Sequence, residues 1–223
     1  CSSLERITIP STVKEIGREA FSHCFQLVEV ELRKGLQQIQ KLAFHACDSL
    51  ERISIPSSVQ EIGHGAFSFC KSLRNAELCD GLETITKCAF SSCESLEHIV
   101  VPSSVKVIDQ RAFDYCTRLR KVELVDGLKS IMKGAFWYCS SLERIIIPSS
   151  VEHFGTFRGC ERLMHVELHD GLQEIPHMAF SNCKSLVQIR VPSSVKVIGR
   201  YAFHSCTQLR EAELFDGLEE IMP

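Results

Sequence analysis

One unit is repeated along the whole chain, and this repeat constrains the fold more than any other feature. In its most regular form it reads L-x-x-I-x-I-P-S-S-V-x-x-I-G-x-x-A-F-x-x-C, as in residues 186–206. Successive copies begin 23 residues apart, except that the copy from Leu142 has 21 residues. The copies start at Leu4, Leu27, Leu50, Leu73, Leu96, Leu119, Leu142, Leu163, Leu186 and Leu209. A fixed period of about 20–50 residues indicates a solenoid, in which each coil contacts its neighbours. We therefore expect residues 1–223 to form a single solenoid domain, cut from a longer chain.

Two kinds of coil alternate, which gives a larger period of 46 residues. One kind carries a Pro-Ser step, at Pro10, Pro56, Pro102, Pro148 and Pro192. The other kind carries a Gly-Leu step, at Gly35, Gly81, Gly127, Gly171 and Gly217. Proline lacks an N–H group and ends a strand, whereas glycine accepts the positive φ of a tight turn. Both steps therefore predict the same corner of the coil.

Within each coil the hydrophobic period changes. The Leu-x-x-Ile-x-Ile stretch alternates as a short strand does. Ile198, Ala202 and Cys206 then recur every four residues, which is typical of one face of a short helix. The residue after the isoleucine varies, and Gly17 and Pro176 are both accepted at a helix start. We therefore predict an α/β solenoid with a parallel sheet on one face and short helices or turns opposite.

The coil from Leu142 departs from the pattern. Against the template it lacks two residues, with Phe154 at the isoleucine position and Thr156 where alanine is usual. We expect a truncated helix and a local change of curvature over residues 154–160.

The motif LxxIxIPSSVxxIGxxAFxxC resembles the BspA-type leucine-rich repeats, also described as the surface-antigen class. The resemblance covers nearly the whole chain and implies a right-handed leucine-rich-repeat solenoid, a hand that agrees with the general rule for parallel crossovers. The asparagine column of more familiar leucine-rich repeats is absent, since Ser58 or Gly81 stands there. Family members are mostly linked to adhesion and protein recognition at cell surfaces, which implies a protein partner without identifying it.

Ten of the twelve cysteines share one repeat position, and we predict a structural column of free thiols. The column comprises Cys1, Cys24, Cys47, Cys70, Cys93, Cys116, Cys139, Cys160, Cys183 and Cys206. Bridges between coils stay open as an alternative, because neighbouring strands lie about 4.8 Å apart and disulfide Cα separations begin near 4.4 Å. Many free thiols favour a reducing interior, whereas the family resemblance implies the cell surface, so the compartment is left open.

A second column consists of phenylalanines, for which ring stacking along the core is expected. Its members are Phe21, Phe44, Phe67, Phe90, Phe113, Phe136, Phe157, Phe180 and Phe203. Trp137 and Tyr138 follow Phe136, with Phe69 and Tyr115 in the slot of Tyr138. We expect these aromatic side chains to pack on the neighbouring coil, with a second exposed partner site at Trp137 and Tyr138 as the alternative.

Several classes of chemistry are not expected. The chain has 25 basic and 28 acidic residues, and this near-balance gives no reason to expect nucleic acid. No run approaches the roughly 18 apolar residues of a membrane span. Zinc sites usually combine Cys-x₂₋₄-Cys pairs with matching histidines, and nucleophilic catalysis needs a constellation that occurs once. A repeat offers the same residues ten times, so we predict no enzyme, no metal and no cofactor.

The outward side chains of the strands form two rows along the solenoid. The first row is Arg6, Glu29, Arg52, Asn75, His98, Lys121, Arg144, His165, Gln188 and Glu211. The second row is Thr8, Glu31, Ser54, Glu77, Val100, Glu123, Ile146, Glu167, Arg190 and Glu213. Val100 and Ile146 interrupt the polar row, although folding does not require apolar side chains at these outward positions. We predict a binding strip at Arg52, Glu77, His98, Val100, Lys121, Glu123, Arg144, Ile146 and Glu167. The alternative is a solvated face whose charges compensate one another.

The sequence therefore predicts a non-catalytic recognition scaffold that binds a protein, or a glycan, on its strand face. A structural spacer within a longer surface or intracellular protein is the alternative. Neither the partner nor the oligomeric state is predicted.

Overall fold

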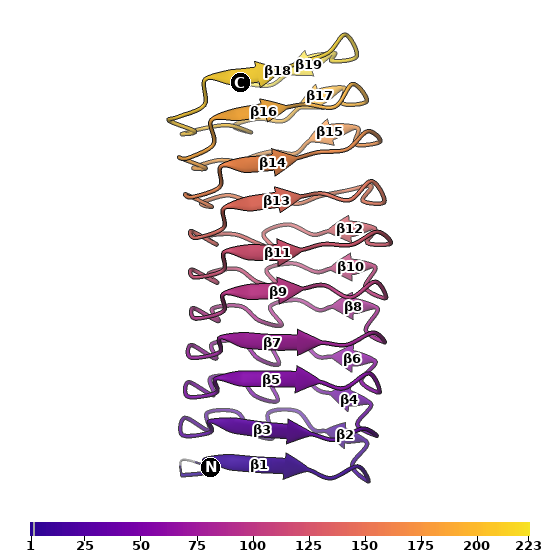
Figure 1. Ribbon diagram of the computed structural model, residues 1–223, viewed down its shortest axis with the longest axis vertical. Coiled ribbons are helices and arrows are strands. Elements are labelled where there is room, and N and C mark those ends of the chain that lie inside the picture. The colour runs from indigo at the N-terminus through magenta and orange to yellow at the C-terminus, as the bar shows by residue number, and fades with distance from the viewer. Residues whose placement is uncertain (2) are drawn as a thin grey trace.

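Two ladders of parallel strands run along an elongated solenoid of stacked coils (Figure 1), which a computed structural model describes for residues 1 and 3–223. The first ladder is an eight-stranded sheet. Its strands are β1 (Arg6–Ile9), β3 (Glu29–Leu32), β5 (Arg52–Ile55), β7 (Asn75–Leu78), β9 (His98–Val100), β11 (Lys121–Glu123), β13 (Arg144–Ile146) and β14 (His165–Glu167). A two-stranded sheet of β16 (Gln188–Arg190) and β18 (Glu211–Glu213) follows it along the solenoid.

The second ladder consists of two-residue strands and is also divided. Its first part contains six strands: β2 (Glu15–Ile16), β4 (Gln38–Ile39), β6 (Glu61–Ile62), β8 (Thr84–Ile85), β10 (Val107–Ile108) and β12 (Ser130–Ile131). Its second part contains β15 (Glu174–Ile175), β17 (Val197–Ile198) and β19 (Glu220–Ile221). Each coil thus contributes one strand to each ladder, except the coil from Leu142, which contributes only β13.

The strands pair in register, so that each paired strand residue lies opposite the equivalent residue of the next coil. Arg6 lies opposite Glu29, and Lys121 lies opposite Arg144. Equivalent side chains therefore lie above one another, which is the arrangement that the fixed repeat predicts.

The predicted helices are wrong: residues 1 and 3–223 contain no helix. The Ile-x-x-x-Ala-x-x-x-Cys segment is instead a chain of four-residue turns. In the coil from Leu73, the N–H groups of Cys88, Phe90 and Ser92 donate to carbonyl groups of the next coil at 3.0, 2.8 and 2.8 Å. The intervening N–H groups of Ala89 and Ser91 donate to carbonyl groups three residues back, both at 3.1 Å. Every second N–H therefore points along the solenoid, where a helix would direct it within its own turn.

Left-handed residues make these turns possible. In the same coil Cys88 and Ser92 have φ values of 56° and 58°. Fourteen non-glycine residues with φ between 54° and 61° occupy these two slots in successive coils. Such a conformation costs an L-residue about 1–2 kcal/mol, and the hydrogen bonds between coils offset that cost. A recurrence of four residues fits stacked turns as well as a helix, which is why the pattern was misleading.

The two kinds of corner are complementary, which accounts for the alternation. Gly81 has φ of 127°, and its N–H donates to Ser104 Oγ in the next coil at 3.1 Å. The same bond joins Gly127 to Ser150 at 2.9 Å, and the Ser150 hydroxyl donates onward to a carbonyl at 2.8 Å. The second serine of each Pro-Ser-Ser step therefore stabilises the glycine corner of the coil before it.

The core consists of the two predicted columns together with the leucines and isoleucines of the repeat. The nine phenylalanine rings form one stack, with centroids 5.2–5.9 Å apart and planes within 12° of parallel. From Cys47 to Cys206, each column thiol donates to the carbonyl of a column phenylalanine in the coil before, at 3.1–3.3 Å. Within the described residues all twelve cysteines are free thiols. The column thus contributes hydrogen bonds as well as apolar packing.

The second ladder is interrupted at the coil from Leu142. His153 forms a single bridge with Ser130, and among the described residues this ladder has no further strand before β15. In regular coils the residue after the isoleucine donates to the preceding coil, as Gly63 and Gly199 do at 2.6 and 2.7 Å. Pro176 occupies that position here and has no N–H to donate. Pro176 therefore provides no donor to connect its coil with the short coil before it, and it does not begin a helix, contrary to the prediction.

The described residues also include no helix long and apolar enough to cross a membrane.

Candidate functional site

The outward strand face carries the predicted strip. Residues Arg52, Glu77, Lys121, Arg144 and Glu167 are exposed on strands β5, β7, β11, β13 and β14. The register places Lys121 opposite Arg144 and Ile146 opposite Glu167. Val100 and Ile146 lie in the second row with 44% and 39% of their surface exposed. The register sets Val100 beside Glu123 on the adjacent strand. The strip is therefore continuous along β5 to β14.

Glu123 is the centre of a small charged cluster on this face. Lys121 Nζ lies 2.5 Å, and His98 Nε2 3.0 Å, from the same oxygen of Glu123. These hydrogen bonds, chiefly the one from Lys121, lower the pKa of the Glu123 carboxyl. The carboxylate therefore accepts hydrogen bonds from both side chains, in the same row as Val100 and Ile146.

Most other charges of the face are also paired. Arg144 donates to Glu167 on the next strand, and Arg190 lies 3.3 Å from Glu213. Further along the face, Asn75 Nδ2 donates to Glu77 at 3.3 Å. Exposed pairs of this kind contribute about 0–1 kcal/mol to stability, so the fold does not depend on them.

The aromatic patch is largely involved in intramolecular contacts. Trp137 is less than half exposed, its Nε1 donates to Thr156 Oγ1, and the Arg111 guanidinium lies 5.4 Å from its ring centre. Tyr138 stacks on Tyr115 with centroids 4.8 Å apart. These contacts support packing on neighbouring coils, whereas Tyr115 and Phe69 stay open to solvent, at 47% and 45% exposure.

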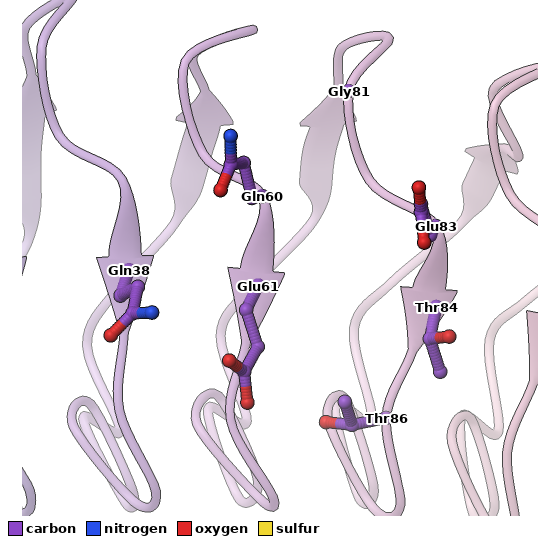
Figure 2. A pocket seen from close by; sticks show the side chains of 7 residues that line it. All are labelled: Gln38, Gln60, Glu61, Gly81, Glu83, Thr84 and Thr86. Carbon is purple, nitrogen blue, oxygen red and sulfur yellow. The ribbon is translucent and has the colours of Figure 1, made fainter.

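A polar groove of about 600 Å³, which the sequence analysis did not identify, lies over β4, β6 and β8. Figure 2 shows its lining: Gln38, Gln60, Glu61, Gly81, Glu83, Thr84 and Thr86. Amide, carboxylate and hydroxyl groups can exchange hydrogen bonds with a polar ligand. Because the lining comes from three successive coils, the spacing of coils rather than any local motif creates this groove.

A second hollow, of about 560 Å³, lies at the interruption of the second ladder. The missing two residues of the short coil indicated an irregularity there, but nothing in the pattern indicated a cavity. Across the described part of the chain, no three His, Cys, Asp or Glu side chains converge as a metal site would require.

Comparison with known proteins agrees with this architecture. The family model described as BspA type leucine-rich repeat region matches residues 1–120, 37–157 and 129–222. Among solved structures, a leucine-rich repeat protein from Bacteroides ovatus is 28% identical, with a TM-score of 0.58, covering 97% of this chain and 74% of that one.

Two further structures share the fold at lower identity. The pneumococcal vaccine antigen PcpA is 24% identical, with a TM-score of 0.61 over 97% of this chain and 67% of that one. A leucine-rich repeat protein of T. pallidum is 24% identical, with a TM-score of 0.59 over 93% of this chain and 79% of that one. A search of curated proteins finds no match.

Proposed function

The chain belongs to the BspA-type leucine-rich repeat family, and we propose that it is a non-catalytic recognition scaffold whose strand face binds a partner protein. Adhesion at a cell surface is the form of recognition that the family resemblance suggests.

The observation that carries this proposal is the exposure of Val100 and Ile146 in a row that is otherwise polar. Both side chains point away from the core, so packing inside the coil does not require them to be apolar. Protein interfaces combine an apolar centre with a polar rim. Val100, Ile146 and the fixed carboxylate of Glu123 reproduce that combination on a rigid sheet.

The fixed charges add directional contacts to this apolar centre. Glu123 is held by Lys121 and His98, and Arg144 is held by Glu167. Side chains that are already ordered lose less conformational entropy on binding. The strip therefore presents a preorganised surface to a partner.

A glycan is the second class of ligand that the scaffold can accommodate, and the polar groove at Gln38, Gln60 and Glu61 favours it. Amides and carboxylates in a shallow groove suit the hydroxyl groups of a sugar. A structural spacer is the remaining alternative, and the pairing of charges across the strand face favours it.

Substitution of the strip tests the proposal. The triple variant Glu123→Gln, Arg144→Gln, Ile146→Ser removes its charged and apolar centre. The matched control Arg6→Gln, Thr8→Ser, Glu29→Gln alters the same two rows at the end of the sheet. Both variants should unfold within about 0.5 kcal/mol per site of the wild type, because the altered side chains are exposed.

Affinity capture from native extract then separates the alternatives. A partner captured by the wild type and the control but lost by the strip variant supports recognition on this face. Retention of the same partner by the strip variant would contradict it, and capture of no partner by the wild type would favour the spacer.

A further inference from the structure

The hollow at the short coil is lined mainly by apolar side chains. Ile131, Phe154 and Ile175 are all buried and form its floor. Met132, Pro176, Val197 and Met222 also line it. Its volume of about 560 Å³ lies within the range of pockets that enclose small ligands, about 300–1,000 Å³. The space exists because the coil from Leu142 lacks the two residues that would cross it.

The backbone beside the hollow has unused hydrogen-bonding groups. β15 pairs with β17 on one side, and within the described part of the chain no strand pairs with it on the other. In regular coils the N–H equivalent to that of Glu174 donates to the coil before, as Ser130 does at 3.1 Å. Among the described residues, the Glu174 N–H has no such partner, and the Phe154 carbonyl receives no bond from Pro176. An edge of this kind can accept an added strand.

Two cations, Lys133 and Arg200, and the imidazole of His177 lie just beyond this edge. Lys133, His177 and Arg200 all line the hollow and follow β12, β15 and β17 by two residues. Neither Lys133 nor Arg200 forms an ion pair within the part of the chain that the structure describes. Glu174 is the one acidic residue of the lining. Lys133, His177 and Arg200 occupy one repeat position in their coils. The coil from Leu142 lacks this position, so the row of basic side chains has a gap at the hollow.

We propose that this hollow binds the C-terminal end of a peptide whose last residue is apolar. The peptide adds to the free edge of β15, parallel to it, and exchanges backbone hydrogen bonds with Glu174 and Phe154. Its last side chain fills the apolar hollow. A strand that runs parallel to β15 ends where Lys133, His177 and Arg200 lie, so the terminal carboxylate meets the Lys133 and Arg200 cations and can accept a hydrogen bond from the His177 imidazole.

Each of the three features accounts for one part of this ligand. The apolar floor alone would accept any apolar group, and the cations alone would accept any anion. The unpaired strand edge selects a ligand with a peptide backbone. Addition to a sheet edge and capture of a terminal carboxylate are both known modes of peptide recognition.

Fluorescence anisotropy of short fluorescein-labelled peptides tests the proposal. The peptides end in Phe, Leu, Ile or Ser, each as the free acid and as the C-terminal amide. Peptides with an apolar last residue should bind as free acids, and the amides should bind about tenfold more weakly, because a charge-assisted hydrogen bond is lost. Lys133→Gln and Arg200→Gln should each weaken the free acid by about tenfold as well.

Two further variants control for effects on folding. Lys87→Gln changes the residue at the repeat position of Lys133, but between coils whose second-ladder strands pair regularly, and it should leave binding unchanged. A repaired chain, with Gln-Arg inserted between Gly155 and Thr156 and with Pro176→Gly, should complete the ladder and bind no peptide. Its circular dichroism should match that of the wild type.

The proposal would be overturned if the amides bound as tightly as the free acids, or if the peptide ending in Ser bound as tightly as those ending in an apolar residue. It would also be overturned if the repaired chain bound the peptides as tightly as the wild type, or if the wild type bound none of them. Equal binding of a simple amphipathic carboxylate without an amide backbone would also refute it, because the strand edge would then play no part. Variants of the strand face should leave peptide affinity unchanged, so this test is independent of the proposed function.

Discussion

Substitution of Gly81 by alanine should destabilise the solenoid more than its position in a surface corner suggests. Gly81 has φ of 127°, a conformation that residues with a side chain rarely adopt. A methyl group built on it would lie 2.7 Å from the backbone oxygen of Ser57 in the preceding coil. The same residue donates its N–H to Ser104 Oγ in the following coil at 3.1 Å. A shift of the corner would therefore disturb the coils on both sides.

The magnitude follows from these two effects. A side chain held in a sparsely populated backbone region costs about 1–3 kcal/mol. Loss of a neutral hydrogen bond adds about 1 kcal/mol. We therefore expect Gly81→Ala to lower the free energy of unfolding by roughly 2–4 kcal/mol.

Urea unfolding followed by circular dichroism measures the change, and Gly17→Ala is the matched control. A methyl group at Gly17 would meet no atom within 4 Å, and Gly17 does not have positive φ. The control should stay within about 0.5 kcal/mol of the wild type. If both variants unfolded at the same urea concentration, the explanation of the alternating corners would be refuted.

Three other predictions concern buried side chains. Burial raises the pKa of Asp114, whose Oδ1 has no hydrogen-bond partner among the described residues. Stability should therefore be greatest while this carboxyl is protonated and should fall as the pH rises through its pKa in the folded state. Asp114→Asn should raise the urea midpoint at neutral pH, and an unchanged pH profile would contradict this. Burial also raises the pKa of the column thiols from Cys70 to Cys206, to about 11 for Cys206. A thiol reagent should therefore label the exposed Cys1 and Cys79 in the native protein and all twelve cysteines only after unfolding, and rapid native labelling of the whole column would count against the stack. Phe113 lies between two rings, with centroids 5.5 and 5.4 Å away. Phe113→Ala should lower the free energy of unfolding by about 3–5 kcal/mol, measured by urea unfolding, whereas Phe203→Ala at the half-buried end of the stack should lower it less. Equal losses would contradict the packing.

The columns and the outward rows could be predicted from the sequence because a fixed period places equivalent residues one coil apart. Phe113 stacks on Phe136 for that reason, and Lys121 lies beside Arg144. The ladder of parallel strands follows from the same regularity together with alternation at the isoleucines.

The turns could not be predicted because their hydrogen bonds connect coils. Ile-x-x-x-Ala-x-x-x-Cys satisfies a helical period, and nothing in a single coil shows that the N–H of Phe90 has a partner at Ala112. The left-handed slots are also hidden, since residues as different as Cys88 and Tyr115 occupy them.

The hollow lies where two local exceptions coincide. The length of the coil from Leu142 predicts an irregularity, but its effect depends on Pro176 in the next coil. The position of Pro176, taken alone, predicts a helix start. A missing donor and a missing pair of residues at one junction leave β15, among the described residues, without a paired strand on the side of the short coil. An exception to a repeat therefore has to be interpreted together with the coils that contact it.

The direct test of the stacked-turn solenoid is the hydrogen-bond partner of the Phe113 N–H. A long-range HNCO spectrum detects scalar coupling across a hydrogen bond and identifies the accepting carbonyl. The structure predicts coupling to Ala135 in the next coil, where the N–H lies 2.8 Å from the carbonyl oxygen. Coupling to the carbonyl of Asp109, four residues back in the same coil, would show a helix and contradict the account.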